Sequence, residues 1–262
     1  MRLVTWNVRS LKQDRAAVVA VLRALEPDVV ALQEAPKWWR GAHRLRRLAA
    51  DSGLEVAVPA GVLGARTCAV LVRADGSPPG DGRRPPVRPV RVVSWRAVRL
   101  RLRVTGRQHW YPTLRGAALA VVRPADGPDV VVASVHLSLD PRERAEHLGE
   151  VVAAVRAVAR GAAVPVDRVV VAGDLNEPPG GEAWRALADA GWRDLAADDA
   201  PTFSTTSPRR RLDAVLAGST LSGAARRVGG EGAQEGAEVA KNVSAGSDHF
   251  PVVADLVLLP RA

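Results

Sequence analysis

Cysteine is nearly absent from this 262-residue chain, in which Cys68 stands alone. A single cysteine excludes an intrachain disulfide framework and a multi-cysteine metal site, and a lone thiol fits a reducing compartment. Aromatic residues are also scarce, at 4% of the chain, although 47% of the residues are hydrophobic. We therefore expect a core filled mainly by Val, Leu and Ala, which a chain of this length can make large.

Long hydrophobic runs are missing as well, because no apolar stretch approaches the roughly 18 residues of a membrane-spanning helix. Met1 is followed at once by the strand-like residues 2–8, without the basic and apolar regions of a signal peptide. The length is compatible with one domain. The sequence thus predicts a single domain over residues 1–262, in a soluble, cytoplasmic and monomeric protein without a membrane span.

Several enzyme signatures are also absent. The chain has no Gly-x-Ser-x-Gly element, no His-Glu-x-x-His element, no Walker A loop and no dinucleotide fingerprint. Cys68 lies in an apolar strand-like setting, which does not favour a reactive thiol. Serine, cysteine and zinc hydrolases are therefore disfavoured.

Lysine is rare, with three among 37 basic residues, yet the net charge is +9. Clustered arginines attract phosphate polyanions, and segments 40–47 and 91–103 are rich in arginine. An excess of Arg, Ala, Val and Gly is also what GC-rich coding produces. The charge alone leaves open a polyanionic partner and an ordinary solvated surface.

Short apolar runs that end in a polar residue alternate with longer amphipathic segments, a pattern typical of a layered α/β domain. The predicted strands cover residues 3–8, 28–33, 67–73, 90–104, 117–122, 130–136, 168–173, 211–216 and 252–258. The predicted helices cover residues 11–25, 38–50, 141–160 and 182–190, with Ser10 as N-cap of the first. Residues 74–89 are predicted as a surface loop and 229–236 as a turn.

Hydrophilic residues interrupt these apolar strands at or near their ends. They are Asn7, Glu34, His136, Asp174, Asn176, Asp213, Asp248 and His249. Any one of them alone is more often a turn former or a solvated side chain. Strand ends that converge on one edge of a sheet nevertheless build active sites from residues far apart in sequence, and we expect one here.

The segment Gly173-Asp174-Leu175-Asn176 indicates the chemistry. Residues two apart in an extended segment point to the same side, so Asp174 and Asn176 could face one substrate. A carboxylate can orient and deprotonate water, a histidine can stabilise developing charge, and a hard cation can neutralise phosphate oxygens. These groups together fit the hydrolysis of a phosphate ester.

At this point the sequence resembles the endonuclease/exonuclease/phosphatase superfamily, which is also called deoxyribonuclease I-like. The resemblance spans residues 5–254, and six short motifs occur in the order and approximate spacing of that family. They are Thr5-Trp6-Asn7-Val8, Leu32-Gln33-Glu34, Val135-His136-Leu137, Gly173-Asp174-Leu175-Asn176, Arg211-Leu212-Asp213 and Ser247-Asp248-His249. Each motif alone is weak, and their ordered succession is specific.

The resemblance implies a four-layer α/β/β/α sandwich with two packed mixed β-sheets, and it assigns roles. Glu34, Asn7 and Asp248 would hold Mg²⁺, with Mn²⁺ or Ca²⁺ as alternatives. Asp174 and Asn176 would position and activate the attacking water. His249, oriented by Asp213, and His136 would contact the scissile phosphate, and Arg115 would lie near it.

The resemblance does not fix the substrate. The motif set and the positive charge favour a nuclease that cleaves phosphodiester bonds in nucleic acid. A phosphatase or phosphodiesterase for a lipid, nucleotide or sugar phosphate is the alternative. Asn176 is followed by Glu177 rather than by the arginine of inositol phosphatases, and His136 lies where abasic-site nucleases usually carry a Tyr-x-Pro segment. Those two branches are therefore disfavoured, and an inactive binding module is a further, weaker alternative.

Overall fold

The structure is a computed structural model that describes residues 1–36, 40–73, 90–102, 113–125, 127–230 and 234–258. Two six-stranded sheets form its centre. The first has the order β11-β12-β1-β2-β4-β3, with β1 (Arg2–Asn7), β2 (Val29–Gln33), β3 (Leu54–Val58), β4 (Ala69–Arg73), β11 (Leu221–Arg227) and β12 (Val252–Leu258). The second has the order β5-β6-β7-β8-β10-β9, with β5 (Val90–Arg99), β6 (Gly116–Pro124), β7 (Val130–His136), β8 (Val169–Asp174), β9 (Arg193–Asp194) and β10 (Asp213–Ala217).

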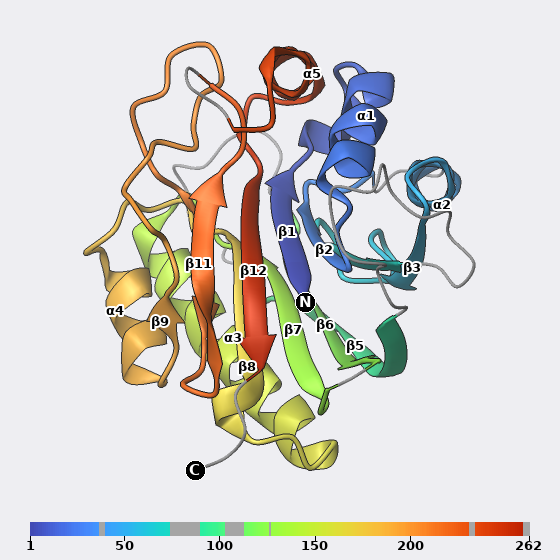
Figure 1. The fold of residues 1–262 in the computed structure, drawn as a ribbon. Coiled ribbons are helices and arrows are strands. Elements are labelled where there is room, and N and C mark those ends of the chain that lie inside the picture. Colours follow the sequence, from blue (N-terminus) through green and yellow to red (C-terminus); the bar gives the residue numbers. More distant parts are fainter. Residues whose placement is uncertain (37–39, 74–89, 103–112, 126, 231–233, 259–262) are drawn as a thin grey trace.

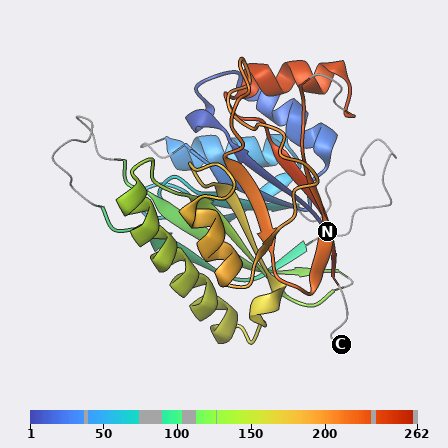
Figure 2. The same cartoon turned by 90° about the vertical axis from the view of Figure 1, so that its left-hand side faces the viewer.

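Helices cover the outer faces of both sheets (Figures 1 and 2). The first sheet packs against α1 (Arg15–Leu25), α2 (Gly41–Asp51) and α5 (Ala237–Gly246). The second packs against α3 (Pro141–Gly161) and α4 (Glu182–Asp189). Between the sheets lies a core of mostly Val, Ala and Leu side chains, as the scarcity of aromatic residues predicted. The predicted four-layer α/β/β/α sandwich with two mixed sheets is therefore confirmed.

Each sheet contains one parallel pair among its described strands, and both pairs lead to the same place. Strands β1 and β2 run parallel with α1 as the crossover, and β7 and β8 run parallel with α3 as the crossover. Every other registered pair is antiparallel. Parallel strands need a long connection and end at one edge of the sheet. The polar residues that follow these four strands consequently share that edge.

The predicted N-cap of the first helix is wrong. Ser10 lies in a 3-10 turn (Arg9–Leu11) with a left-handed φ of 57°, and α1 begins only at Arg15. The side chain of Asp14 caps it instead, accepting hydrogen bonds from the N–H groups of Ala16 and Ala17. Both residue types are good N-caps, so the backbone path decides between them.

Other boundaries differ from the prediction for local reasons. Helix α2 begins at Gly41, and residues 37–39 lie outside the described residues, as do 74–89 and 103–104. The sequence analysis did not predict β3, β9, β11 and α5. Strand β11 has few β-branched residues and contains Gly223, whose φ of 139° places it beside the backbone of Asp255. Such a segment carries a weak strand signal.

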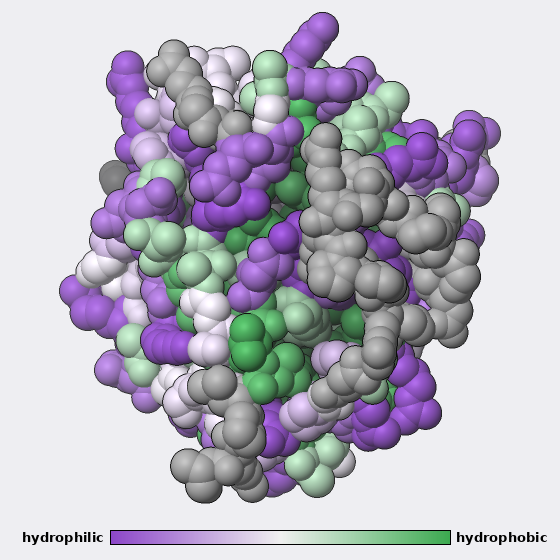
Figure 3. Space-filling model, viewed as in Figure 1, coloured by the Kyte–Doolittle hydropathy of each residue, from purple (hydrophilic) through white to green (hydrophobic). Residues whose placement is uncertain are grey.

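The described surface is mixed in polarity. On the face seen in Figure 3, hydrophilic side chains occupy most of the periphery and hydrophobic ones gather toward the middle. Strands rather than helices form the centre of this view, and Val257 of β12 is among the exposed apolar residues. None of the described helices is long and apolar enough to cross a membrane.

Candidate active site

The predicted residues converge on one edge of the two sheets. Strand β1 rises from the N-terminus in Figure 1 and ends at Asn7, and β2 ends just before Glu34. From the second sheet, β7 ends at His136 and β8 ends at Asp174, and these two residues are register partners. Two sheets thus contribute their parallel strand ends to a single polar cluster.

Asp174 is the centre of this cluster and is almost fully buried, with 1% of its surface exposed. Its Oδ2 atom accepts a hydrogen bond from Nδ2 of Asn7 at 3.1 Å and lies 3.5 Å from Nε2 of His136. Its Oδ1 atom accepts the backbone N–H of Asn176 at 2.9 Å. The sequence offered no evident carboxylate beside His136, and the structure places Asp174 there.

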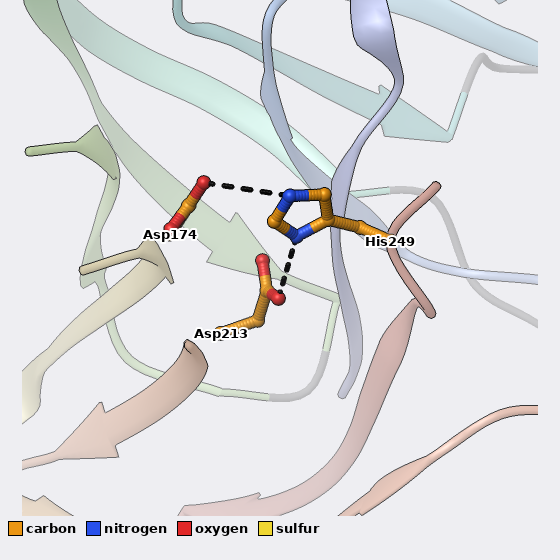
Figure 4. Close-up of side chains that lie close together, drawn as sticks. All are labelled: Asp174, Asp213 and His249. Atoms are coloured by element: carbon orange, nitrogen blue, oxygen red, sulfur yellow. Dashed lines mark hydrogen bonds and ion pairs between the residues drawn. The ribbon is translucent and has the colours of Figure 1, made fainter. Parts of the chain in front are cut away.

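His249 faces two carboxylates at once (Figure 4). Its Nδ1 atom is 2.9 Å from Oδ2 of Asp213, and its Nε2 atom is 3.9 Å from Oδ2 of Asp174. The histidine lies just before β12 of the first sheet, whereas both carboxylates belong to the second. The ring therefore lies between two acids with its two nitrogen atoms turned to different partners.

Burial acts in opposite directions on the pKa values of Asp174 and His249, whereas the charge of Asp213 raises both. Burial, together with the negative charge of Asp213, raises the pKa of the Asp174 carboxyl to about 6. Burial alone would lower the pKa of His249, but the charge and hydrogen bond of Asp213 outweigh it and raise that pKa to about 9. A carboxyl with a pKa near neutrality beside a charged imidazole is suited to receiving a proton from water.

Glu34 and Asn7 form a second, more open part of the site. Glu34 is half-buried, has a left-handed φ of 46°, and has Oε1 at 3.4 Å from Nδ2 of Asn7. Oδ2 of Asp248 lies 3.4 Å from Nε of Arg9 in an ion pair. Within the described residues no hydrogen bond or ion pair joins Asp248 to Glu34. Asn7 is tied to the neighbour of Asp248, because its carbonyl accepts the Ser247 hydroxyl at 2.6 Å.

Two groups of donor atoms in this site could hold a divalent cation: the oxygen atoms of Glu34 and Asn7, and the triad of Asp174, Asp213 and His249. Ligand atoms of Asp174, Asp213 and His249 lie within 4.8 Å of one another, and Oδ1 of Asp213 is buried with no hydrogen-bond partner among the described residues. This triad differs from the ligand set that the resemblance implies. Because Asp213 favours the protonated form of His249, which has no free lone pair on either ring nitrogen, the triad as it stands is a poor ligand set for a cation.

Arg115 and Asn176 lie beside the cluster. Arg115 is buried, and its Nη1 atom donates a hydrogen bond to the carbonyl of His136 at 3.4 Å. Burial lowers the pKa of this guanidinium, which still remains charged. Asn176 has a left-handed φ of 53° and donates from Nδ2 to the carbonyl of Leu137 at 2.9 Å. A buried guanidinium beside the cluster is a suitable contact for phosphate.

Gly173 explains how β8 reaches the site. Its φ is 151°, and a Cβ atom added there would lie 2.0 Å from the carbonyl oxygen of Val135. The glycine therefore allows β7 and β8 to approach closely at the last register pair before His136 and Asp174.

Several residues around His249 had no role in the sequence reading. Trp6 is fully buried and donates from Nε1 to the His249 carbonyl at 2.8 Å. The ring of Phe203 lies 4.7 Å from that of His249, centroid to centroid. Thr202 and Arg9 also contact the site's backbone or side chains. Only Trp6, as the neighbour of Asn7 in its motif, carried a sequence signal.

Cys68 does not belong to this site as a nucleophile. Its thiol is fully buried and donates to the carbonyl of Gly116 at 3.0 Å. Burial raises its pKa to about 12, so it stays protonated near neutrality. Cysteine chemistry is therefore disfavoured by the structure as well.

Comparisons with known proteins agree with this arrangement. A sequence profile described as the Endonuclease/Exonuclease/phosphatase family matches residues 4–249. No curated protein gives a match. A functionally unknown conserved protein from Enterococcus faecalis has a similar structure, with a TM-score of 0.71, 17% identity, and coverage of 98% of this chain and 100% of that one.

Two further similar structures carry functional names. One is the mannosyl-6-phosphatase of Bacteroides thetaiotaomicron, with a TM-score of 0.66, 14% identity, and coverage of 98% of this chain and 100% of that one. The other is the human nocturnin catalytic domain with bound sulfate, with a TM-score of 0.65, 17% identity, and coverage of 98% and 93%. At such identities these likenesses show a shared fold.

Proposed function

The chain belongs to the endonuclease/exonuclease/phosphatase family, and on this premise we propose that it is a cation-dependent phosphodiesterase whose first substrate class is nucleic acid. Members of this family hydrolyse phosphoesters. The single observation that carries the proposal for this chain is the buried pair of Asp174 and His249, with Nε2 of the ring 3.9 Å from Oδ2 of the carboxylate.

In the proposed reaction Asp174 takes a proton from the attacking water. Its elevated pKa, about 6, makes the carboxylate basic enough for this step while it is still ionised at neutral pH. Asn7 and the backbone N–H of Asn176 hold the carboxylate by hydrogen bonds at 3.1 and 2.9 Å. They fix the direction in which its oxygen atoms point.

His249 has the complementary role. Asp213 at 2.9 Å keeps the imidazole charged and oriented, so its Nε2–H can stabilise negative charge on the phosphate in the transition state. His136 also lies beside Asp174, with Nε2 at 3.5 Å from Oδ2, and its carbonyl accepts a hydrogen bond from Arg115. They would contact the same phosphate or aid the departing oxygen.

Glu34, with Asn7 and Asp248, would hold the cation, and Mg²⁺ is the ion proposed first, ahead of Mn²⁺ and Ca²⁺. Carboxylate and amide oxygens are the ligands that such ions prefer. When bound, the cation would neutralise phosphate oxygens and so lower the barrier to attack.

Nucleic acid is proposed first because exposed arginines lie near this edge. Arg99 ends β5 opposite Gly116, the neighbour of Arg115, and Arg96 and Arg99 are both exposed. The arginines of α2, Arg44, Arg46 and Arg47, are exposed as well. These positions would allow a polyanion backbone to extend from the site. A small phosphate ester is the second candidate, and one similar structure is named a mannosyl-6-phosphatase.

The decisive experiment assays the purified chain with Mg²⁺ against plasmid DNA, RNA, bis(p-nitrophenyl) phosphate and p-nitrophenyl phosphate. Asp174→Asn serves as the inactive control. Cleavage of a polynucleotide and of the diester, lost in the control, supports the proposal. Turnover of the monoester alone would replace it with the small-substrate phosphatase. The single domain, the monomeric state and the cytoplasmic location are parts of the same proposal.

A further inference from the structure

A short segment, residues 202–205, runs alongside the catalytic turn that contains His249. The N–H of Phe250 donates to the carbonyl of Thr202 at 2.9 Å, and Phe203 forms an isolated antiparallel bridge with His249. Farther along, the N–H of Thr205 donates to the carbonyl of Asp248 at 2.9 Å. This segment is therefore fastened to the turn before β12, which belongs to the first sheet.

The same segment is also fastened to the residues that lead into β10 of the second sheet. The N–H groups of Thr202 and Phe203 donate to the carbonyl of Arg210 at 2.9 and 3.0 Å, and the Thr202 side chain adds two further bonds. The hydroxyl oxygen of Thr202 accepts the backbone N–H of Leu212 at 3.0 Å and that of Asp213 at 3.1 Å. Thr202 is 1% exposed, so water is excluded from these bonds. Thr202 thus connects the backbone of Asp213, through its hydroxyl, to the residue after His249, through its carbonyl.

We propose that Thr202 is a positioning residue that holds Asp213 and His249 at hydrogen-bonding distance across the two sheets. The inference rests on the proposed function, because it concerns the same pair. Asp213 has little else to hold its side chain. Its Oδ2 atom meets Nδ1 of His249 at 2.9 Å, and its Oδ1 atom has no hydrogen-bond partner among the described residues. The position of that carboxylate therefore depends on its backbone, which the pairing with β8 holds and to which the Thr202 hydroxyl adds two hydrogen bonds.

The chemistry of the anchor requires a hydroxyl. Valine has the shape of threonine but accepts no hydrogen bond, so Thr202→Val would leave two buried N–H groups without an acceptor. The backbone at the start of β10 would then move until these N–H groups reach other acceptors. Thr202→Ser keeps the acceptor, and Thr202→Ala removes it without placing a methyl group against the two N–H groups.

The kinetic test compares these variants with Thr220→Val. Thr220 is a matched control, because its hydroxyl donates to the Asp167 carbonyl at 2.7 Å away from the cluster. We expect Thr202→Val to lower kcat roughly 10-fold or more with KM nearly unchanged, the scale for losing a residue that orients a catalytic group. Thr202→Ser and Thr220→Val should stay near the wild-type kcat.

A double-mutant cycle separates positioning from a general structural effect. If Thr202 acts through Asp213, Thr202→Val should cause no further loss in an Asp213→Asn background. The proposal would be overturned if the loss of kcat in the double variant equalled the product of the losses in the two single variants. A folded Thr202→Val protein with normal kcat would overturn it as well.

A spectroscopic readout on the metal-free protein needs no turnover. The His249 Nδ1–H proton, hydrogen-bonded to Asp213, should give a low-field proton NMR signal in the wild type, Thr202→Ser and Thr220→Val. It should broaden or vanish in Thr202→Val. If Thr202→Val fails to fold, Thr202→Ala serves instead, and an unchanged signal in that variant would overturn the proposal. Loss of the signal in a protein without phosphodiesterase activity would leave the positioning role intact and refute only the proposed function.

Discussion

Nδ1 of His249 lies 2.9 Å from Oδ2 of Asp213, although the two residues belong to different sheets. Asp213 begins β10 of the second sheet, and His249 lies in the turn that leads into β12 of the first. A hydrogen bond of this length tolerates little relative movement of the two layers. The packing of the sheets against each other therefore sets the geometry of the candidate catalytic pair.

Substitutions in the triad of Asp174, His249 and Asp213 should lower activity without unfolding the protein. We predict that Asp174→Asn and His249→Ala each lower kcat by roughly 100-fold or more, the scale for a general base or a transition-state stabiliser. Asp213→Asn should cost less, because it alters the orientation of His249 rather than a contact with phosphate. Steady-state kinetics with circular dichroism as a folding control test this, and three folded, fully active variants would refute the assignment.

The stability of the metal-free protein should fall as the pH rises from about 6.5 to 9. The folded-state pKa of His249, about 9, is above its ordinary value of 6.5. A raised pKa contributes stability that is fully present below pH 6.5 and is lost as the pH passes through 9. The shift corresponds to roughly 3 kcal/mol of unfolding free energy. Urea unfolding at a series of pH values measures it.

Asp213→Asn provides the matched comparison for this pH dependence. It removes the charge that raises the pKa of His249, so the decline between pH 6.5 and 9 should become much shallower in the variant. Other groups that titrate in this range are shared by both proteins and cancel in the difference. Identical slopes in the two proteins would contradict the prediction.

The sequence predicted that these polar residues come together, because the position of their cluster follows from strand direction. An apolar run followed by a polar residue indicates where a buried strand ends, as at Asn7, His136 and Asp174. Once the strands are parallel and adjacent, their ends must meet. Apolar runs and motif order therefore predicted that these residues come together without any knowledge of distances.

The sequence could not predict features that depend on the path of the chain between strands. No sequence pattern marks Thr202, because its contact with Asp213 exists only where the loop that contains it passes beside that residue. Asp14 replaced Ser10 as the cap because the intervening turn is left-handed. The pairing of Asp248 with Arg9 likewise needs the approach of two segments from opposite ends of the chain.

Catalysis should require a divalent cation that Glu34 binds. We predict that EDTA abolishes turnover and that Mg²⁺ or Mn²⁺ restores it, since oxygen ligands of this kind prefer such ions. Glu34→Gln keeps the size of the side chain but removes its charge, so cation affinity should fall roughly 10-fold or more, about 1.4 kcal/mol. Isothermal titration calorimetry measures the affinity independently of turnover. Unchanged affinity in the variant would assign the cation to other residues.

Gly173 should resist replacement by alanine. A Cβ atom there would lie 2.0 Å from the Val135 carbonyl oxygen, so β7 and β8 would have to separate. We expect Gly173→Ala to lower the unfolding free energy by roughly 1–3 kcal/mol or more, and to lower kcat because Asp174 is the next residue. Gly149→Ala in α3 is the control, because nothing lies within 4 Å of its added Cβ atom. Helix propensity predicts that it is neutral or slightly stabilising.

The substrate class should be visible in the salt dependence of binding, measured with the inactive Asp174→Asn variant so that the polynucleotide survives. A protein that neutralises several phosphates releases counterions, and its affinity should fall by roughly 10²-fold or more between about 50 and 200 mM salt. Arg96→Gln and Arg99→Gln remove exposed cations at the end of β5, so each should reduce the slope of log K against log salt by about 1. Arg156→Gln on α3 removes a similar exposed charge on the helix that covers the far side of the second sheet, and it should leave the slope unchanged. Weak binding that varies little with salt, in a protein that still hydrolyses a small phosphate ester, would mean that the arginines are a solvated surface, and the small-substrate phosphatase would then be the better assignment.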